Sequence, residues 1–290
     1  MDPRTLASSL ICFLEGSNLD GRLWDPLRAH LPATTEVLVP GCRADPGGTG
    51  AEEETETLVG ELRGRERHTH LGIVGYGSDG GRRACLLARA SLEAGLPLVG
   101  MALVSAVPPV LGRGILADGE LRSAAKAAAG RTRTLYGDIL GDPSLAPSPV
   151  RLAEALADKA LQSPGFTSLA EGDERRALAA DMLAQGLRHV TVASGSPRPG
   201  GSGRSRRADP AALVRSGRVL DDSALAGITA PVLVVVGDDD EAEHRRSAEA
   251  LTTAFPNCLG VVALRGAGQL VPLDAPVALA EALVGFFLAA

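Results

Sequence analysis

The sequence predicts an α/β protein with a mostly parallel sheet covered by helices, and two observations support this fold class. Apolar runs of strand length alternate with segments of helical periodicity. The run from Pro231 to Val236 is almost entirely Val and Leu, as expected for a strand buried on both faces. A chain of 290 residues is long enough for one large domain that carries an insertion.

Six strands and five core helices are expected from these patterns. The strands are Leu10–Leu14, Glu36–Val39, Leu71–Gly75, Leu98–Val104, Pro231–Val236 and Gly260–Leu264. The helices are Arg22–His30, Thr55–Arg63, Gly81–Ala94, Arg245–Ala254 and Pro276–Leu288.

The middle of the chain has a different pattern. Its two helical segments, Pro149–Gln162 and Asp173–Leu187, have no strand between them. A tract of Gly, Ser, Pro and Arg at 194–207 predicts a solvated loop, and the alternative is an arginine-rich flap over an anionic ligand. We therefore expect a sheet domain in two parts with an inserted helical cap, divided as 1–130, 131–218 and 219–290.

Composition excludes several classes of function. The net charge is −6 and no basic block is present, so nucleic acid is not an expected partner. The apolar run Leu10–Leu14 stops at Glu15 and is too short for a signal peptide or a membrane span. The four cysteines are far apart, which favours free thiols over a metal site. We expect a cytoplasmic protein that acts on a small molecule without a metal or cofactor.

Three stretches of the chain together resemble the α/β-hydrolase superfamily. Residues 13–27 look like the strand, oxyanion loop and first helix of that family. Residues 72–81 (Gly-Ile-Val-Gly-Tyr-Gly-Ser-Asp-Gly-Gly) occupy the place of its nucleophile elbow. Residues 228–272 are similar to its acid loop followed by its histidine loop. The resemblance covers all but the cap, and it implies the α/β-hydrolase fold.

The general base of the family falls at Gln269 in this sequence. A base must take and return a proton near neutral pH, and an amide cannot do this. Gln269 can only hold or orient a ligand or a water molecule by hydrogen bonds. Two histidines are candidates for a displaced base: His244, four residues after Asp240, and His189 in the cap.

The elbow has three possible registers. Counting from the preceding strand puts Gly77 at the nucleophile position, and Gly77 carries no side chain. Counting back from the helix selects Ser78, although bulky Tyr76 then stands where a small residue is needed. A third register puts Asp79 there, which resembles the epoxide-hydrolase branch that attacks with a carboxylate. These three readings remain open at the level of sequence.

Two further positions carry carboxylates. Asp240 matches the acid of the family, but with glutamine at 269 the sequence shows no obvious partner for it. If buried, Asp240 would have a raised pKa and could exchange protons itself; the alternative is a solvated loop. Glu15 replaces the usual histidine of the oxyanion loop, whose Gly16 and Ser17 can still offer backbone N–H groups. Glu15 is either a new acid/base group or a structural partner of an arginine.

These departures, read with the resemblance, imply an enzyme that keeps the family's pocket and has abandoned ester hydrolysis. Relatives with altered triads carry out cyclisation, addition, elimination or carbon–carbon bond formation, often in polyketide and other natural-product (antibiotic) pathways. The residues expected to line the chamber are Glu15, Ser78, Asp79, Asp240 and Gln269, and those expected to contact a bulky, largely apolar substrate are Trp24, Tyr76 and Tyr136.

Two other functions remain as alternatives. One is an ester or epoxide hydrolase that uses Ser78 or Asp79 with a displaced histidine. The other is a ligand-binding protein without catalytic activity, which would favour a closed apolar pocket with few polar groups.

Overall fold

The central feature of the structure is a sheet of six parallel strands. The computed structural model describes residues 9–16, 18–41, 50–65, 69–106, 139, 148–166, 168–169, 173–195 and 225–288. The strand order is β2-β1-β3-β4-β5-β6. The strands are β1 Ser9–Leu14, β2 Thr35–Leu38, β3 His70–Tyr76, β4 Leu98–Val104, β5 Val232–Gly237 and β6 Cys258–Leu264. Each of the six expected strands is therefore confirmed.

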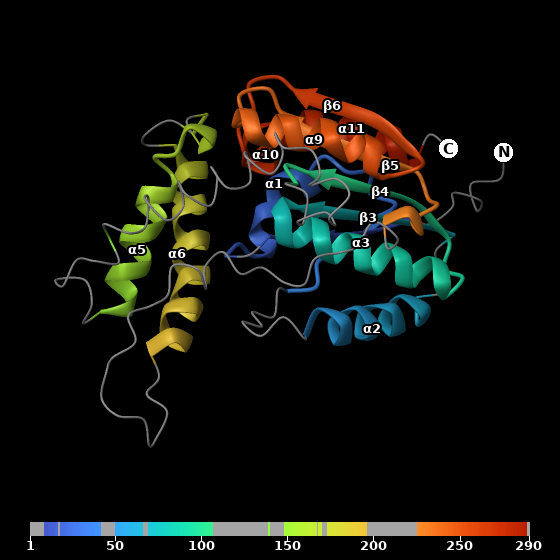
Figure 1. Cartoon of the computed structure of the whole chain (residues 1–290), viewed down its shortest axis with the longest axis horizontal. Helices are drawn as coiled ribbons and strands as arrows, with labels where there is room; N and C mark the ends of the chain where they lie inside the picture. The colour runs from blue at the N-terminus through green and yellow to red at the C-terminus, as the bar shows by residue number, and fades with distance from the viewer. Residues whose placement is uncertain are drawn as a thin grey trace, which may run out of the picture.

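Helices cover both faces of this sheet (Figure 1). One face carries α2 Gly50–Arg63, α3 Gly77–Glu93 and α9 Ala242–Ala254. The other face carries η2 Gly21–Trp24, α1 Asp25–Arg28, α10 Val271–Asp274 and α11 Pro276–Leu288. A separate apolar cluster lies between the sheet and each helical layer, which explains why β5 is buried along its whole length.

The strand order places a switch point between β1 and β3. From β1 the chain runs outward to β2 at the edge and then returns to the other side of β1 to form β3. In open parallel sheets, ligands bind at the carboxyl ends of the strands beside such a point. Glu15 follows β1 and Gly77 follows β3, so both lie at this edge.

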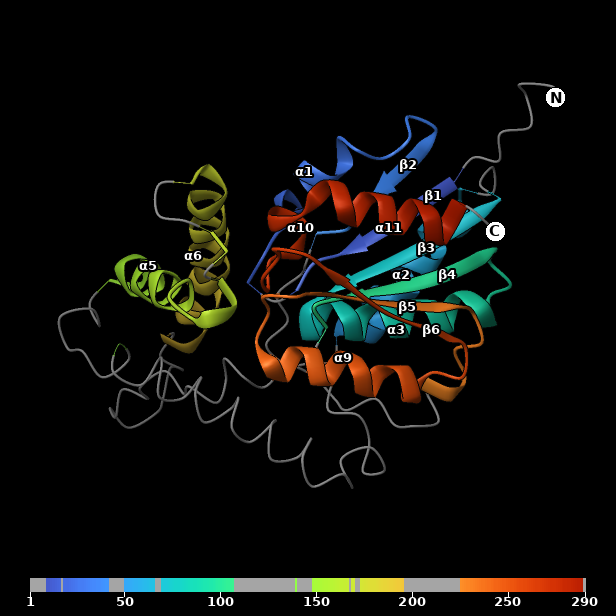
Figure 2. The same cartoon turned by 90° about the horizontal axis from the view of Figure 1, so that it is seen from above.

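Helices α5 Pro149–Ala160 and α6 Glu174–Gly195, with the short η4 Pro164–Phe166, lie beyond the carboxyl ends of the strands (Figure 2). Gly186 of α6 packs so closely on the backbone of Asn18 that a Cβ at 186 would overlap it. Gly165 of η4 accepts a hydrogen bond from the Gln269 N–H at 2.6 Å. These helices fit the expected cap, while the division into core and cap stays a prediction.

Several expected boundaries were wrong. α3 begins at Gly77 rather than Gly81, because the helix starts directly after β3 with no linking residues. The expected helix 22–30 is divided into η2 and α1, and the short α10 was not anticipated. α6 extends beyond Leu187 to Gly195, so the first two residues of the expected loop 194–207 are helical and the rest lies outside the described residues.

Among the described residues, Cys12 and Cys85 are buried free thiols and Cys258 is a half-buried one. Burial raises the pKa of both the Cys12 and the Cys85 thiol to about 12. None of the helices in the described ranges has both the length and the apolar character needed to cross a bilayer.

Candidate active site

The turn between β3 and α3 has its left-handed residue at Gly77, with φ of +65°. A nucleophile elbow is a sharp strand-to-helix turn of this kind. Ser78 and Asp79 come after the turn and belong to the first turn of α3. The backbone therefore adopts the register in which a glycine occupies the apex. Catalytic roles for Ser78 and Asp79 stay predictions, but neither residue lies at the apex.

Two other glycines allow α3 to start so close to the sheet. A Cβ on Gly75 would overlap the Gly80 carbonyl oxygen, and a Cβ on Gly80 would overlap the Leu14 carbonyl oxygen at the end of β1. At Gly77, by contrast, an added Cβ would meet no atom of the described residues within 4 Å, and its only cost is the strain of a side chain at a φ of +65°. The apex thus has room for a side chain that this sequence does not supply.

Asp240 has an imidazole partner, which the sequence did not make obvious. His244 Nδ1 lies 2.7 Å from Asp240 Oδ1, and the Glu241 N–H also donates to this oxygen at 2.7 Å. The Asp240 side chain is fully buried and His244 is 14% exposed. The two residues are four apart across the start of α9, a spacing that brings side chains together on one helical face. This spacing was the signal that the sequence offered for the pair.

Gln269 lies next to Asp240 and under the cap. The position where a Cβ of Gly165 would stand is 3.3 Å from Gln269 Cβ and 3.4 Å from Asp240 Oδ1. The Tyr76 hydroxyl donates to the Gln269 carbonyl oxygen at 3.0 Å. The pKa of Tyr76 is raised well above its usual value by burial and by the charges of Asp240 and Asp274. Asp240, Gln269 and Tyr76 therefore meet at one place.

Asp274 at the end of α10 joins this group, although the sequence gave no reason to single it out. Its Oδ2 accepts hydrogen bonds from the Ser168 hydroxyl and the Gly268 N–H, both at 2.8 Å. Desolvation is the main cause that raises its pKa, and the charge of Asp240 adds to it. The two hydrogen bonds thus join Ser168 to the loop before α10, and the charge of Asp240 acts on the same carboxyl group.

Glu15 is completely buried beside Arg83 of α3. Arg83 donates to the Glu15 carbonyl oxygen at 3.1 Å and forms an ion pair with Glu54 of α2 at 2.5 Å. The charges of Arg83 and Glu15 both act on the Cys12 thiol, which faces the α2–α3 layer. The hydrogen bond from Arg83 holds the Glu15 backbone, and both readings of its carboxylate, as an acid or base and as a structural group, stay predictions.

The aromatic residues expected to bind substrate belong to the core. Trp24 and Tyr76 are 0% and 4% exposed and meet edge-to-face at 6.3 Å between ring centroids, and Phe13 packs on Trp24 at 4.7 Å. Gly16 contacts the end of β3, where a Cβ would lie 3.1 Å from the Tyr76 carbonyl oxygen. The remaining expected residues, Ser17, Tyr136 and the side chain of His189, lie outside the described part of the chain.

Solved structures match this arrangement over nearly the whole chain. The structure of MenH from S. aureus has a TM-score of 0.65 and 16% identity, over 100% of this chain and 97% of that one. The chain has the α/β-hydrolase fold. NosK from Streptomyces actuosus shares this fold, with a TM-score of 0.57 and 18% identity over 98% of this chain and 99% of that one. Est816, an N-acyl homoserine lactone degrading enzyme, also shares it, with a TM-score of 0.58 and 18% identity over 96% of this chain and 93% of that one. No family profile and no curated protein matches the sequence.

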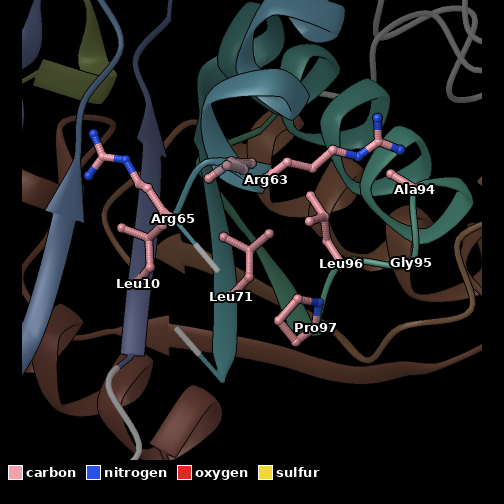
Figure 3. A pocket seen from close by; sticks show the side chains of 9 residues that line it. Leu10, Arg63, Arg65, Leu71, Ala94, Gly95, Leu96 and Pro97 are labelled. Carbon is pink, nitrogen blue, oxygen red and sulfur yellow. The ribbon is translucent and has the colours of Figure 1, made fainter. Parts of the chain in front are cut away.

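One cavity lies away from the carboxyl edge of this α/β-hydrolase fold (Figure 3). It has a volume of about 330 Å³ and is located at the amino ends of β1 and β3, with an apolar wall that includes Leu10, Leu71 and Leu96. Arg65 at its rim is already paired with Glu36 and Glu61. The cavity is therefore at the opposite end of the sheet from Gly77, Asp240 and Gln269.

Proposed function

We propose that this protein is an enzyme of the α/β-hydrolase fold that catalyses a non-hydrolytic reaction by proton transfer, with the His244–Asp240 pair as its base. One combination of observations supports the proposal: the elbow has Gly77 at its apex, while an imidazole is bound to the acid after β5. In this proposal the site has an imidazole that can act as a base, and it lacks the nucleophile that ester hydrolysis through a covalent intermediate requires.

The chemistry follows from the orientation of the imidazole. An ionised carboxylate only accepts hydrogen bonds, so His244 carries its proton on Nδ1 when it faces Asp240. The lone pair is then on Nε2, which is the atom that takes a proton from the substrate. The buried carboxylate of Asp240 stabilises the imidazolium that forms. The positive end of α3, directly after Gly77, favours negative charge that develops on the substrate.

The substrate class follows from the resemblance of the sequence to non-hydrolytic relatives. A carbon acid next to a carbonyl group, in a bulky and largely apolar polyketide-type compound, loses a proton to the base. The resulting enolate then cyclises, adds to a second carbonyl group or forms a carbon–carbon bond. All three outcomes share the same first step, so proton removal is the step to test.

The test uses the N-acetylcysteamine thioester of 3-oxooctanoic acid in D₂O, with exchange of its C2 protons followed by NMR. We expect the wild-type protein to accelerate exchange and His244→Ala to reduce the acceleration by about 10²- to 10⁴-fold, the usual contribution of a general base. His30→Ala is the matched control, because His30 is an exposed histidine after α1. It should exchange as fast as the wild type.

A second experiment tests the absence of a covalent step. Wild-type protein should give no burst with 4-nitrophenyl acetate and no adduct with a fluorophosphonate probe by mass spectrometry. The double variant Gly77→Ser, Gln269→His should gain an adduct on residue 77, because a side chain there has open space. A wild-type burst together with an adduct would overturn the proposal in favour of a hydrolase.

A further inference from the structure

Ser105 occupies the residue position directly after β4, at the same edge as the candidate site. The preceding residue, Val104, pairs with Tyr76 on β3 and with Val235 on β5. Ser105 follows Val104 and Gly77 follows Tyr76, so these two residues lie side by side just past the ends of β4 and β3. The Ser105 N–H donates to the Val235 carbonyl oxygen at 2.9 Å, which holds its backbone against β5.

Two properties set Ser105 apart from an ordinary strand-end serine. Its φ is +44°, in the left-handed region, where Asn18 is the only other non-glycine among the described residues. It is only 2% exposed, and its Oγ has no hydrogen-bond partner within the described ranges. A buried hydroxyl without a partner and a left-handed backbone each cost stability, and such costs are often found at functional sites.

A second buried atom without a hydrogen-bond partner lies at the end of the neighbouring strand. Asp240 Oδ1 binds His244, but among the described residues no donor reaches Asp240 Oδ2. A carboxylate oxygen can only accept, whereas a serine hydroxyl can also donate. A ligand hydroxyl or enol has the chemistry to complement either atom, since it can donate to a carboxylate oxygen and accept from a serine hydroxyl.

We propose that Ser105 contacts the substrate, and that its hydroxyl binds a hydroxyl or enol oxygen of that molecule. The inference rests on the proposed function, because it places the substrate at the carboxyl edge of the sheet beside His244. No covalent bond to Ser105 forms. Ser105 holds the polar oxygen of the substrate while the base acts on a neighbouring carbon.

The experiment measures binding of 1-naphthol and of naphthalene, which has the same apolar body and no hydroxyl. Trp24 is the single tryptophan and packs against Tyr76, so its fluorescence reports binding. Ser105→Ala should weaken 1-naphthol binding about five- to tenfold, the size of one hydrogen bond, and leave naphthalene binding unchanged. Ser91→Ala is the matched control, because Ser91 is a fully buried serine in α3 that has no partner in the described part of the chain and lies far along the helix from Gly77.

The stability of the variant separates a binding role from a structural one. Because its hydroxyl has no partner among the described residues, Ser105→Ala should melt at the wild-type temperature or above, so weaker binding cannot result from unfolding. Equal affinity of Ser105→Ala and wild type for 1-naphthol, an equal loss for naphthalene, or no wild-type binding of 1-naphthol would each overturn the proposal. Binding needs no turnover, so His244→Ala should still bind 1-naphthol, and failure of the exchange reaction alone would leave the Ser105 assignment standing.

Discussion

At the scale of single residues, acidic groups gather at the carboxyl edge of the sheet, and nearby hydrogen-bond donors offset only part of the cost of burying their charge. Asp274 accepts two hydrogen bonds that favour its charged form, yet desolvation and the nearby Asp240 outweigh them and raise its pKa. A carboxyl group whose pKa is higher in the folded state binds protons more readily there than in the unfolded chain. Its contribution to stability therefore falls as pH rises through the window above its ordinary pKa.

The raised pKa of Asp274 gives a prediction for the Asp274→Asn variant. The amide keeps an oxygen acceptor for Gly268 and Ser168 without the charge, so the variant should be more stable than wild type at pH 7. The gain should shrink as pH falls toward 4, because the raised pKa makes wild-type Asp274 take up its proton at a higher pH than an ordinary aspartate does. Urea unfolding at intervals between pH 4 and 8 measures it. Asp158→Asn, at an exposed position of α5, is the control and should show no such pH-dependent difference.

The turn between β3 and α3 shows that residue identity alone does not decide which residue occupies the apex. Glycines at 75, 77, 80 and 81 made three registers compatible with the same letters. The choice depends on where α3 can approach the sheet, and this is set by Gly75 and Gly80 against each other and against Leu14. These contacts join segments far apart in the chain, so local pattern alone did not select Gly77.

At the scale of elements, Arg83 connects α3 to α2 and to the end of β1. Its side chain is 6% exposed, and its guanidinium binds Glu54 and the Glu15 carbonyl oxygen, so it fixes the loop that follows β1. The alternation of strands and helices was predictable because each element has its own periodicity. The position of Arg83 between three elements could not be predicted in this way, because its partners are 29 and 68 residues away in the sequence.

Removing this contact should be costly. Arg83→Met should lower the free energy of unfolding by about 3 kcal/mol, because it leaves the Glu54 carboxylate and a buried carbonyl oxygen without their donor. Arg89→Met is the comparison on the same helix. Arg89 pairs with Glu93, and both side chains are at least half exposed. Its loss should cost less than about 0.5 kcal/mol in the same urea titrations. Equal losses for the two variants would contradict the bridging role of Arg83.

At the scale of the whole molecule, the cap and the sheet meet through close backbone approaches. Gly186 of α6 packs on Asn18, and Gly165 of η4 packs on the Gly268–Gln269 backbone. Arg175 adds a hydrogen bond to the Leu273 carbonyl oxygen at 3.2 Å. Helix α6 and η4 are therefore held directly against the loops that carry the candidate site.

Gly186→Ala tests this contact, because the new methyl group would overlap the Asn18 backbone. We expect α6 to move away from the sheet and its amide hydrogens to exchange at least about tenfold faster, which corresponds to about 1.4 kcal/mol of lost docking energy. Gly60→Ala in α2 is the matched control. An added Cβ there meets nothing within 4 Å, so it should stabilise its helix by about 0.5–1 kcal/mol. Unchanged exchange in Gly186→Ala would show that the contact is not needed.

The sequence by itself determined the α/β fold class and all six strands, because burial and periodicity are local properties of the chain. The acid position at Asp240 and the base position at Gln269 were implied by the resemblance to the α/β-hydrolase superfamily, and their roles stay predictions. The sequence also included His244 among the candidate bases without showing which carboxylate it would meet. Only the tertiary structure decided that His244 binds Asp240, that Gly77 forms the apex of the elbow, and that Glu15 lies beside Arg83. The physical reason is that these outcomes depend on how separate elements approach one another, and small residues at their contacts set those distances.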